Sequence, residues 1–162
     1  IESLAKTKEV TLTIAGEFWD DQAIYESQIA RLGLESRVTI HAGYVPQDEF
    51  SELFGSHDFL AMPYRSGTGS IVRELAFRFG LPVIATDVGS IAEGITHDVN
   101  GLIIPPHSVD ALTAALASAA NLTTLARWKS AIGDQVQLQH NLWLQYCGVF
   151  LPDSDRSGVT NG

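Results

Sequence analysis

The sequence has few of the residues that characterise several common classes of protein. Cys147 is its single cysteine, so the chain holds no internal disulfide framework and no cysteine-rich metal site. Ten basic residues stand against nineteen acidic ones, and the net charge of −9 is opposite in sign to the basic footprint of a nucleic-acid-binding protein. We therefore expect a protein of a reducing compartment that does not have nucleic acid as its main partner.

Long apolar runs and a leader segment are also lacking. No run approaches the roughly 18 consecutive apolar residues of a membrane-spanning helix, and the N-terminus shows no basic-then-apolar signal pattern. The chain begins at Ile1, and we expect it to be a piece of a longer polypeptide. Its 162 residues, 45% of them hydrophobic, suffice for one domain. We predict that domain over residues 1–150 and a flexible polar tail over residues 151–162.

Short apolar runs alternate with segments of helical periodicity. Strands are predicted at residues 10–15, 37–41, 58–62, 83–86 and 102–104, where β-branched residues end at turn residues. Helices are predicted at residues 20–32, 47–54, 70–79, 91–95, 109–120, 123–132 and 137–146. The alternation indicates an α/β fold, with a Rossmann-like parallel sheet and helices on both faces. Ligands of such folds bind beyond the carboxyl ends of the strands, here in the loops that start at Gly16, Ala42, Pro63 and Asp87.

The segment after the third predicted strand has the composition of an anion-binding loop. The strand ends at Pro63, small residues follow from Ser66 to Ser70, and a helix begins. Glycine allows a close approach of backbone to ligand, and a helix N-terminus offers free N–H groups and a positive dipole. Three arginines and one acid between Arg65 and Arg78 give a local charge of +2. The pattern predicts a phosphate site; the alternative is that Ser70 is only an N-cap and the glycines only form a turn.

Glu74 follows this loop by one helical turn. Helical side chains lean toward the N-terminus, so its carboxylate can point back to the loop and accept hydrogen bonds from two ribose hydroxyls. The alternative is an ion pair with Arg78, four residues on, on a solvated face. The apolar face of the same helix is predicted to consist of Ile71, Val72, Leu75, Ala76 and Phe79.

Other polar and aromatic residues have simpler interpretations. Asp20 and Asp21 resemble a pair of metal-binding carboxylates, but at the start of a helix they more simply complement its dipole. Trp19 has two interpretations, lining the mouth of the cleft or packing under that helix, and we expect packing. No histidine shows metal-ligand spacing, and no Ser-His-Asp order is present. The sequence therefore predicts neither a metal site nor a hydrolase.

Several motifs follow one another in a fixed order over residues 1–116. They include Leu12-Thr-Ile-Ala-Gly16-Glu17, Gly43-Tyr-Val-Pro46, Met62-Pro-Tyr64, Glu74-Leu-Ala76, Gly80-Leu-Pro-Val-Ile-Ala-Thr-Asp-Val-Gly89 and Asn100-Gly-Leu102. In this order and at these spacings the motifs resemble the C-terminal, donor-binding domain of retaining GT-B glycosyltransferases of glycosyltransferase family 4 (glycosyl transferases group 1). The resemblance strengthens the interpretation of the loop as an anion site.

The resemblance implies a role for individual positions. Glu74 takes the place of the glutamate that binds the ribose hydroxyls of the donor nucleotide, and residues 66–71 correspond to the backbone that holds its diphosphate and hexose. Gly43 and Tyr44 correspond to the loop beside the nucleobase. The predicted donor-binding residues are Gly16, Glu17, Gly43, Tyr44, Arg65, Ser66, Gly67, Thr68, Gly69, Ser70, Ile71 and Glu74. No catalytic residue, cofactor or metal ligand is predicted in this chain.

The sequence departs from the family pattern at two places. Ser66 stands where common members carry the first glutamate of a Glu-x7-Glu pair; serine can bind a sugar hydroxyl but brings no negative charge. The family also has a strand and an Arg…Lys-Gly loop upstream of the point where this chain begins. That strand would lie between residues 10–15 and 58–62, so we expect two unpaired strand edges there. Residues 146–151 are apolar enough to fill the gap, but we do not expect them to.

By this resemblance, the complete protein transfers a hexose from a UDP- or GDP-linked donor to a carbohydrate or lipid-linked acceptor. The family reaction retains the anomeric configuration, needs no metal ion, and takes place in the cytoplasm or at the inner face of the membrane. The acceptor would bind to an N-terminal domain outside this chain, so the chain alone is expected to be inactive. Two alternatives stay open: a GT-B epimerase acting on UDP-N-acetylglucosamine, and a non-catalytic domain that keeps the fold for binding or assembly.

Overall fold

The computed structural model describes residues 1–7 and 10–150, with side chains through residue 137, and the predicted tail at 151–162 lies outside this range. The helices are α1 (Glu2–Ala5), α2 (Gln22–Arg31), α3 (Phe50–Gly55), α4 (Ile71–Arg78), α5 (Val109–Ala119) and α6 (Leu122–Phe150), with a 3-10 turn η1 (Gln47–Glu49). The strands are β1 (Leu12–Gly16), β2 (Val38–Ala42), β3 (Leu60–Met62), β4 (Val83–Thr86) and β5 (Gly101–Ile104). The predicted α/β class is confirmed.

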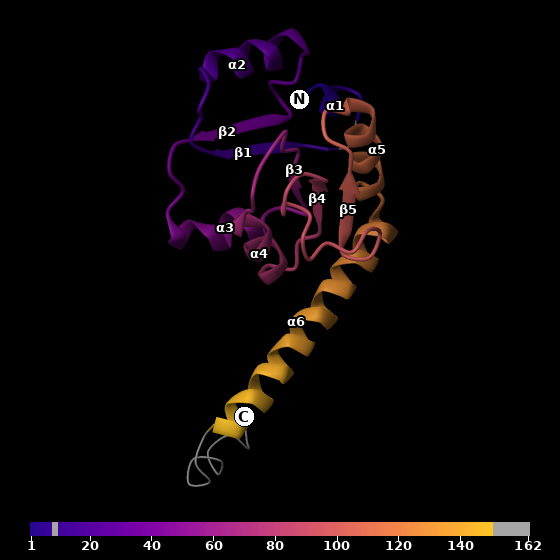
Figure 1. Cartoon of the computed structure of the whole chain (residues 1–162). Coiled ribbons are helices and arrows are strands. Elements are labelled where there is room, and N and C mark those ends of the chain that lie inside the picture. Colours follow the sequence, from indigo (N-terminus) through magenta and orange to yellow (C-terminus); the bar gives the residue numbers. More distant parts are fainter. Residues whose placement is uncertain (8–9, 151–162) are drawn as a thin grey trace.

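The described strands are all parallel, but they form two sheets. β1 pairs with β2, while β4 lies between β3 and β5 in the second sheet. Figure 1 shows β1 and β2 running across the direction of the other strands. β1 and β3 are not paired, as expected, and a 2.7 Å hydrogen bond between Thr13 Oγ1 and His57 Nε2 joins β1 to the segment that precedes β3. The expected gap between β1 and β3 therefore divides the strands into these two sheets.

β4 is the centre of the larger core. Its four residues are all buried, and their side chains alternate between the two faces of the sheet. Val83 and Ala85 belong to the cluster that contains Phe54 of α3 and Ala76 of α4, whereas Ile84 packs in the cluster of α5 and α6 with Trp128. Burial on both faces is the reason why Val83, Ile84 and Ala85 follow one another as an apolar run.

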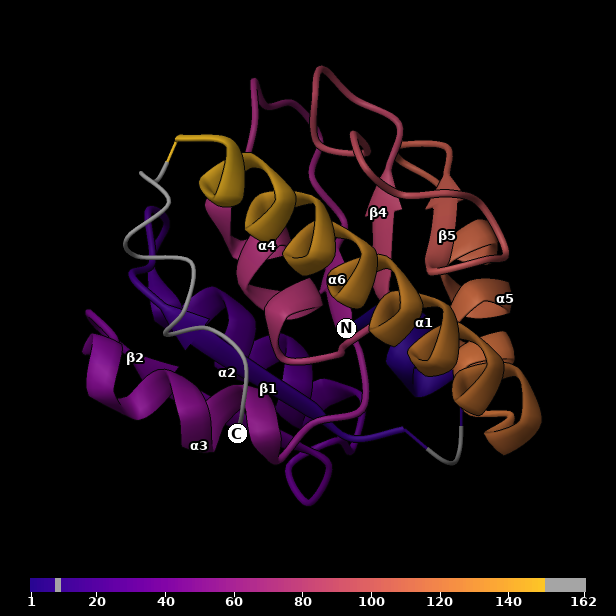
Figure 2. The same ribbon diagram turned by 90° about the horizontal axis from the view of Figure 1, so that it is seen from below.

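Two predictions about helices are wrong. Residues 91–94 form turns rather than a helix, and the backbone amide of Ile91 bonds only three residues back, to Val88 O. The predicted helices at 123–132 and 137–146 are parts of one helix, α6, because an interior glycine such as Gly133 costs only about 1 kcal/mol. The C-terminal part of α6 extends away from the sheets (Figure 1), and α6 packs beside α4 (Figure 2).

The structure also contains a helix that we did not predict, α1 at the N-terminus, which packs against α5. No single helix in the described part of the chain is long and apolar enough to cross a membrane. By length and composition, α5 and the first part of α6 meet that test only together, with a bend of 84° between them. The segment 146–150 is helical, so the gap between β1 and β3 is not filled by it, as expected.

Candidate functional site at the carboxyl end of β3

The loop after β3 is anchored by the turn that follows β4. The buried hydroxyl of Thr86 donates a hydrogen bond to the carbonyl oxygen of Tyr64 at 2.7 Å, and Ser90 Oγ donates to the carbonyl oxygen of Thr68. β3 and β4 are neighbours in the sheet, so both turns leave the same edge. The predicted anion loop is thus a fixed backbone segment with its residues Arg65, Ser66 and Thr68 exposed.

Two glycines make this close packing of loops possible. A Cβ atom at Gly89 would lie 1.9 Å from the carbonyl oxygen of Gly67, and the φ of Gly89 is +50°, a value that favours glycine. Gly67 itself packs against Ile91, whose Cδ1 would lie 3.1 Å from an added Cβ. Since only a hydrogen fits at Gly89, the turn after β4 fixes the position of the loop.

The loop leads directly into a capped helix. Ser70 has extended backbone (φ −154°), and its hydroxyl accepts a 3.3 Å hydrogen bond from the amide of Val72, so it is the N-cap of α4. Ile71, the first residue of α4, is 74% exposed. The predicted start of a helix at this place is confirmed, and its positive end points toward the small-residue loop.

Glu74 is exposed but has a different partner from the one considered in the sequence. Its side chain is 58% exposed, and Oε1 accepts hydrogen bonds from Arg73 Nη2 at 2.6 Å and Nε at 3.2 Å. The pair with Arg78 is therefore not what the structure shows. The role of Glu74 in ribose binding stays a prediction.

Arg73 is the residue that sequence reasoning missed. The buried positions of α4 are Arg73 and Ala76, whereas Ile71 and Phe79 of the predicted apolar face are exposed. A charged side chain can be buried there because its guanidinium meets carbonyl and carboxylate oxygens. The available signal was the spacing of three residues between Arg73 and the buried Ala76, which places both on one helical face.

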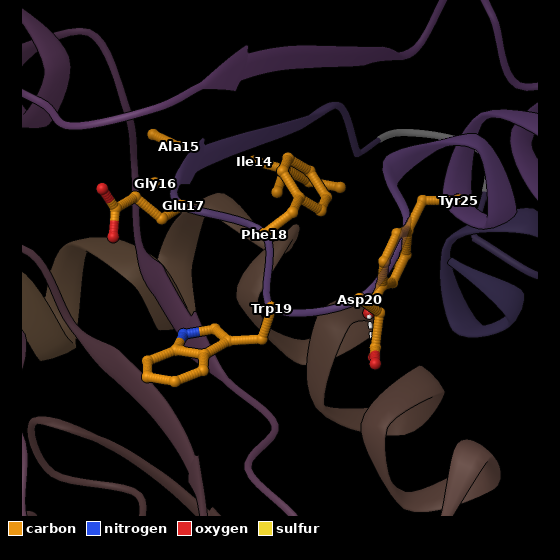
Figure 3. Close-up of a pocket in the computed structure, with 8 residues that line it drawn as sticks. All are labelled: Ile14, Ala15, Gly16, Glu17, Phe18, Trp19, Asp20 and Tyr25. Carbon is orange, nitrogen blue, oxygen red and sulfur yellow. Dashed lines mark hydrogen bonds between the residues drawn. The ribbon is translucent and has the colours of Figure 1, made fainter.

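The other predicted residues lie at the carboxyl end of the smaller sheet. The amide of Gly43 donates a 3.0 Å hydrogen bond to the carbonyl oxygen of Gly16, so the turns after β1 and β2 are joined. Glu17 is exposed, and Tyr44 is 79% exposed. The end of β1 borders a hollow of about 370 Å³, drawn in Figure 3 and lined by Ile14, Ala15, Gly16, Glu17, Phe18, Trp19, Asp20 and Tyr25.

Three of the eight residues that line this hollow are aromatic: Phe18, Trp19 and Tyr25. Trp19 is 99% exposed, so the expectation that it packs under α2 is wrong. Asp21 is the N-cap of α2, in keeping with the helix-start interpretation, and Asp20 accepts a 3.2 Å hydrogen bond from the hydroxyl of Tyr25. This hydrogen bond to Asp20, with burial and the negative charge of Asp20, raises the pKa of the Tyr25 phenol, and the positive charge of Arg65 opposes the rise.

The structure therefore brings the predicted residues together in two groups. One comprises Arg65 to Glu74 and is held by the turn after β4; the other comprises the ends of β1 and β2. Among the described residues, no hydrogen bond or ion pair joins a predicted residue of one group to a predicted residue of the other. The positive charge of Arg65, in the first group, opposes the rise in the pKa of Tyr25, which lies beside the second group. Nowhere in the described part of the chain do three His, Cys, Asp or Glu side chains gather as a metal site.

A solved structure shows which fold this arrangement belongs to. The C-terminal domain of LpcC, a group 1 glycosyl transferase from Francisella tularensis, matches 86% of this chain and 76% of its own with a TM-score of 0.72 and 19% identity. The fold is that of the C-terminal domain of GT-B glycosyltransferases. The sequence pattern of the family "Glycosyl transferases group 1" matches residues 1–121, and the chain belongs to this family.

Two relatives of higher identity are named as glycosyltransferases. An uncharacterized glycosyltransferase of Methanocaldococcus jannaschii is 32% identical over 101 residues, which are 62% of this chain and 25% of that protein. A D-inositol 3-phosphate glycosyltransferase of Jonesia denitrificans is 33% identical over 73 residues, 43% of this chain and 17% of that protein. The chain thus matches a quarter or less of the length of these relatives.

Two solved structures add information on ligands and pathways of similar proteins. WaaG, a glycosyltransferase involved in lipopolysaccharide biosynthesis, is 28% identical with a TM-score of 0.70, and the match covers 81% of this chain and 36% of WaaG. HepE of Anabaena was solved in complex with UDP-glucose; it is 25% identical with a TM-score of 0.60, over 86% of this chain and 43% of HepE.

Proposed function

We propose that this chain binds the nucleotide-diphosphate part of a sugar donor at the carboxyl end of β3. The observation that carries the proposal is the exposed carboxylate of Glu74, one helical turn into a capped helix that begins at an anchored, small-residue loop. A carboxylate suits the neighbouring hydroxyls of a ribose, because each hydroxyl can donate a charge-assisted hydrogen bond. The helix N-terminus and the exposed Arg65 suit the diphosphate.

Uridine is the first candidate for the base. HepE binds UDP and UDP-glucose in its solved complexes, which supports a UDP-linked donor over a GDP-linked one. The exposed ring of Tyr44 and the backbone of Gly43 are the predicted neighbours of the base, and Gly16 and Glu17 would line the same cleft.

In the complete protein, the proposed reaction is transfer of the hexose from the donor to an acceptor hydroxyl with retention of configuration. Negative charge develops on the diphosphate as its bond to the sugar breaks, and fixed donors at the start of α4 with Arg65 would stabilise that charge. Ser66 would meet the hexose with a neutral hydroxyl. The acceptor would bind outside this chain, and we propose a cytoplasmic or inner-membrane-face location for the enzyme.

A thermal-shift panel tests donor binding. The chain is heated with UDP, GDP, ADP and their hexose conjugates, each at about 100 times the expected dissociation constant, where a bound ligand adds about 2.7 kcal/mol of stability. For a domain of this size, that corresponds to a rise in Tm of about 5–10 °C. We expect the rise with UDP and UDP-hexoses.

Two variants define the site in this panel. Glu74→Ala should abolish most of the rise with UDP, whereas Glu52→Ala, which removes an exposed carboxylate from α3, should keep it. The absence of a shift with every nucleotide, including in the full-length protein, would refute donor binding. An equal shift in the parent and Glu74→Ala would refute the ribose role of Glu74.

A further inference from the structure

Arg73 joins the proposed ribose-binding carboxylate to the turn after β4. Its side chain is 10% exposed. Nη1 donates hydrogen bonds to the carbonyl oxygens of Ser90 at 3.0 Å and Ile91 at 3.2 Å, while Nη2 and Nε hold Glu74 Oε1. The guanidinium is planar, so fixing one side on two backbone carbonyls also fixes the direction of the other side.

Only one oxygen of the carboxylate is taken up by this arrangement. Both hydrogen bonds from the guanidinium of Arg73 to Glu74 end at Oε1. The other oxygen, Oε2, belongs to a side chain that is 58% exposed and can therefore accept hydrogen bonds from a ligand.

The same contacts continue to the anion loop. Ser90, which accepts a hydrogen bond from Arg73 through its carbonyl, donates one to the carbonyl oxygen of Thr68 through its hydroxyl. A series of hydrogen bonds thus runs from Glu74 through Arg73 and Ser90 to the loop proposed to hold the diphosphate. This series connects the proposed ribose site with the proposed diphosphate site.

We propose that Arg73 is a positioning residue: by holding Oε1 it presents Oε2 of Glu74 to a ribose hydroxyl at a fixed distance from the diphosphate loop. The inference rests on the proposed function and adds to it a source of selectivity for ribonucleotides. It predicts that loss of the guanidinium reduces the part of the affinity that depends on the ribose hydroxyls. A residue that only stabilised the fold would affect all nucleotides alike.

The experiment measures dissociation constants by calorimetry for UDP and for 2′,3′-dideoxy-UDP, which lacks both hydroxyls. The affinity ratio of the two is compared in the parent chain, Arg73→Met, Arg73→Lys and Glu74→Gln. Arg78→Met is the matched control, since Arg78 is exposed in the last turn of the same helix.

We expect Arg73→Met to reduce the ratio about tenfold, the typical effect of one lost charge-assisted hydrogen bond, with unchanged affinity for dideoxy-UDP. Arg78→Met should keep the parent ratio.

Arg73→Lys keeps the charge but cannot contact two carbonyls and the carboxylate at once. It should therefore also reduce the ratio, and it decides the question if circular dichroism shows that Arg73→Met does not fold. Equal weakening of both nucleotides, or an unchanged ratio in Arg73→Lys, would overturn the positioning role. If Glu74→Gln reduces the affinity ratio of UDP to dideoxy-UDP while the Arg73 variants keep the parent ratio, this inference fails and the proposed function stands. If the parent chain does not distinguish the two nucleotides, the ribose role of Glu74 and this inference fail together.

Discussion

A hydrogen atom at Gly89 is what allows the turn after β4 to touch the loop after β3. Gly89→Ala would place a methyl group 1.9 Å from the carbonyl oxygen of Gly67, at a φ of +50°. We expect a loss of about 1–3 kcal/mol from the clash, in addition to about 1–2 kcal/mol for alanine in the left-handed region. Urea denaturation followed by circular dichroism measures the total.

Gly80→Ala separates the two costs. Gly80 has a φ of +70°, but a Cβ atom there meets no atom within 4 Å. This variant should therefore show only the conformational cost of about 1–2 kcal/mol. Equal losses in the two variants would contradict the close contact between the loops at Gly67 and Gly89.

Asp98 makes the stability of the fold depend on pH. Its Oδ1 accepts hydrogen bonds from Arg127 Nη2 at 2.8 Å and from Trp128 Nε1 at 3.2 Å. The bond from Arg127 and, to a smaller extent, the bond from Trp128 lower the pKa of the carboxyl from its usual 3.8. Because the pKa is lower in the folded chain, the ionised group stabilises the fold at pH values above about 3.8. That contribution is lost as the pH falls through the folded value.

Asp98→Asn tests this dependence, since asparagine tolerates the φ of +60° at this position. The variant should unfold at lower urea concentration than the parent at neutral pH. The difference should shrink as the pH falls below about 4 and the parent carboxyl becomes protonated. A difference that is the same at every pH would show that the ion pair and hydrogen bonds of Asp98 are not its cause.

At the scale of the element, the caps of α4 and α5 are a matched pair. Ser70 accepts a hydrogen bond from the amide of Val72, and Ser108 accepts one from the amide of Ala111 at 3.1 Å. Alanine at either position should cost about 1 kcal/mol in urea denaturation. Only Ser70→Ala should also weaken UDP binding, since Ser70 lies at the proposed diphosphate loop. Equal effects of the two variants on UDP affinity would argue against a role of this helix start in binding.

The elements differ in how far their sequence determines them. β4 was predictable because its apolar run is buried on both faces, and the start of α4 because Ser70 follows a small-residue loop. The partner of Glu74 was not predictable from local spacing. Arg73 is buried on account of carbonyl groups at residues 90 and 91, seventeen or more positions further along the chain. The turns at 91–94 likewise replace a predicted helix.

At the scale of the whole molecule, the two sheets have distinct core clusters that meet at Phe59. The β1–β2 sheet packs on a cluster of Leu4, Val10, Ile29 and Leu34, and its strands are partly exposed, whereas β4 is buried throughout. Local unfolding is easier where few apolar contacts must be broken. We therefore expect hydrogen exchange measured by mass spectrometry to be faster in β1 and β2 than in β4.

Thr13→Val provides the mechanistic test of this difference, because it removes the hydrogen bond between Thr13 of β1 and His57, which precedes β3. It should accelerate exchange in β1 and β2 and leave β4 unchanged. Thr39→Val is the control, since Thr39 lies beside Thr13 in the parallel register, on the more exposed strand β2. Equal exchange in β1 and β4, in the parent chain, would mean that the two sheets unfold as one unit despite their separate hydrogen-bonded ladders.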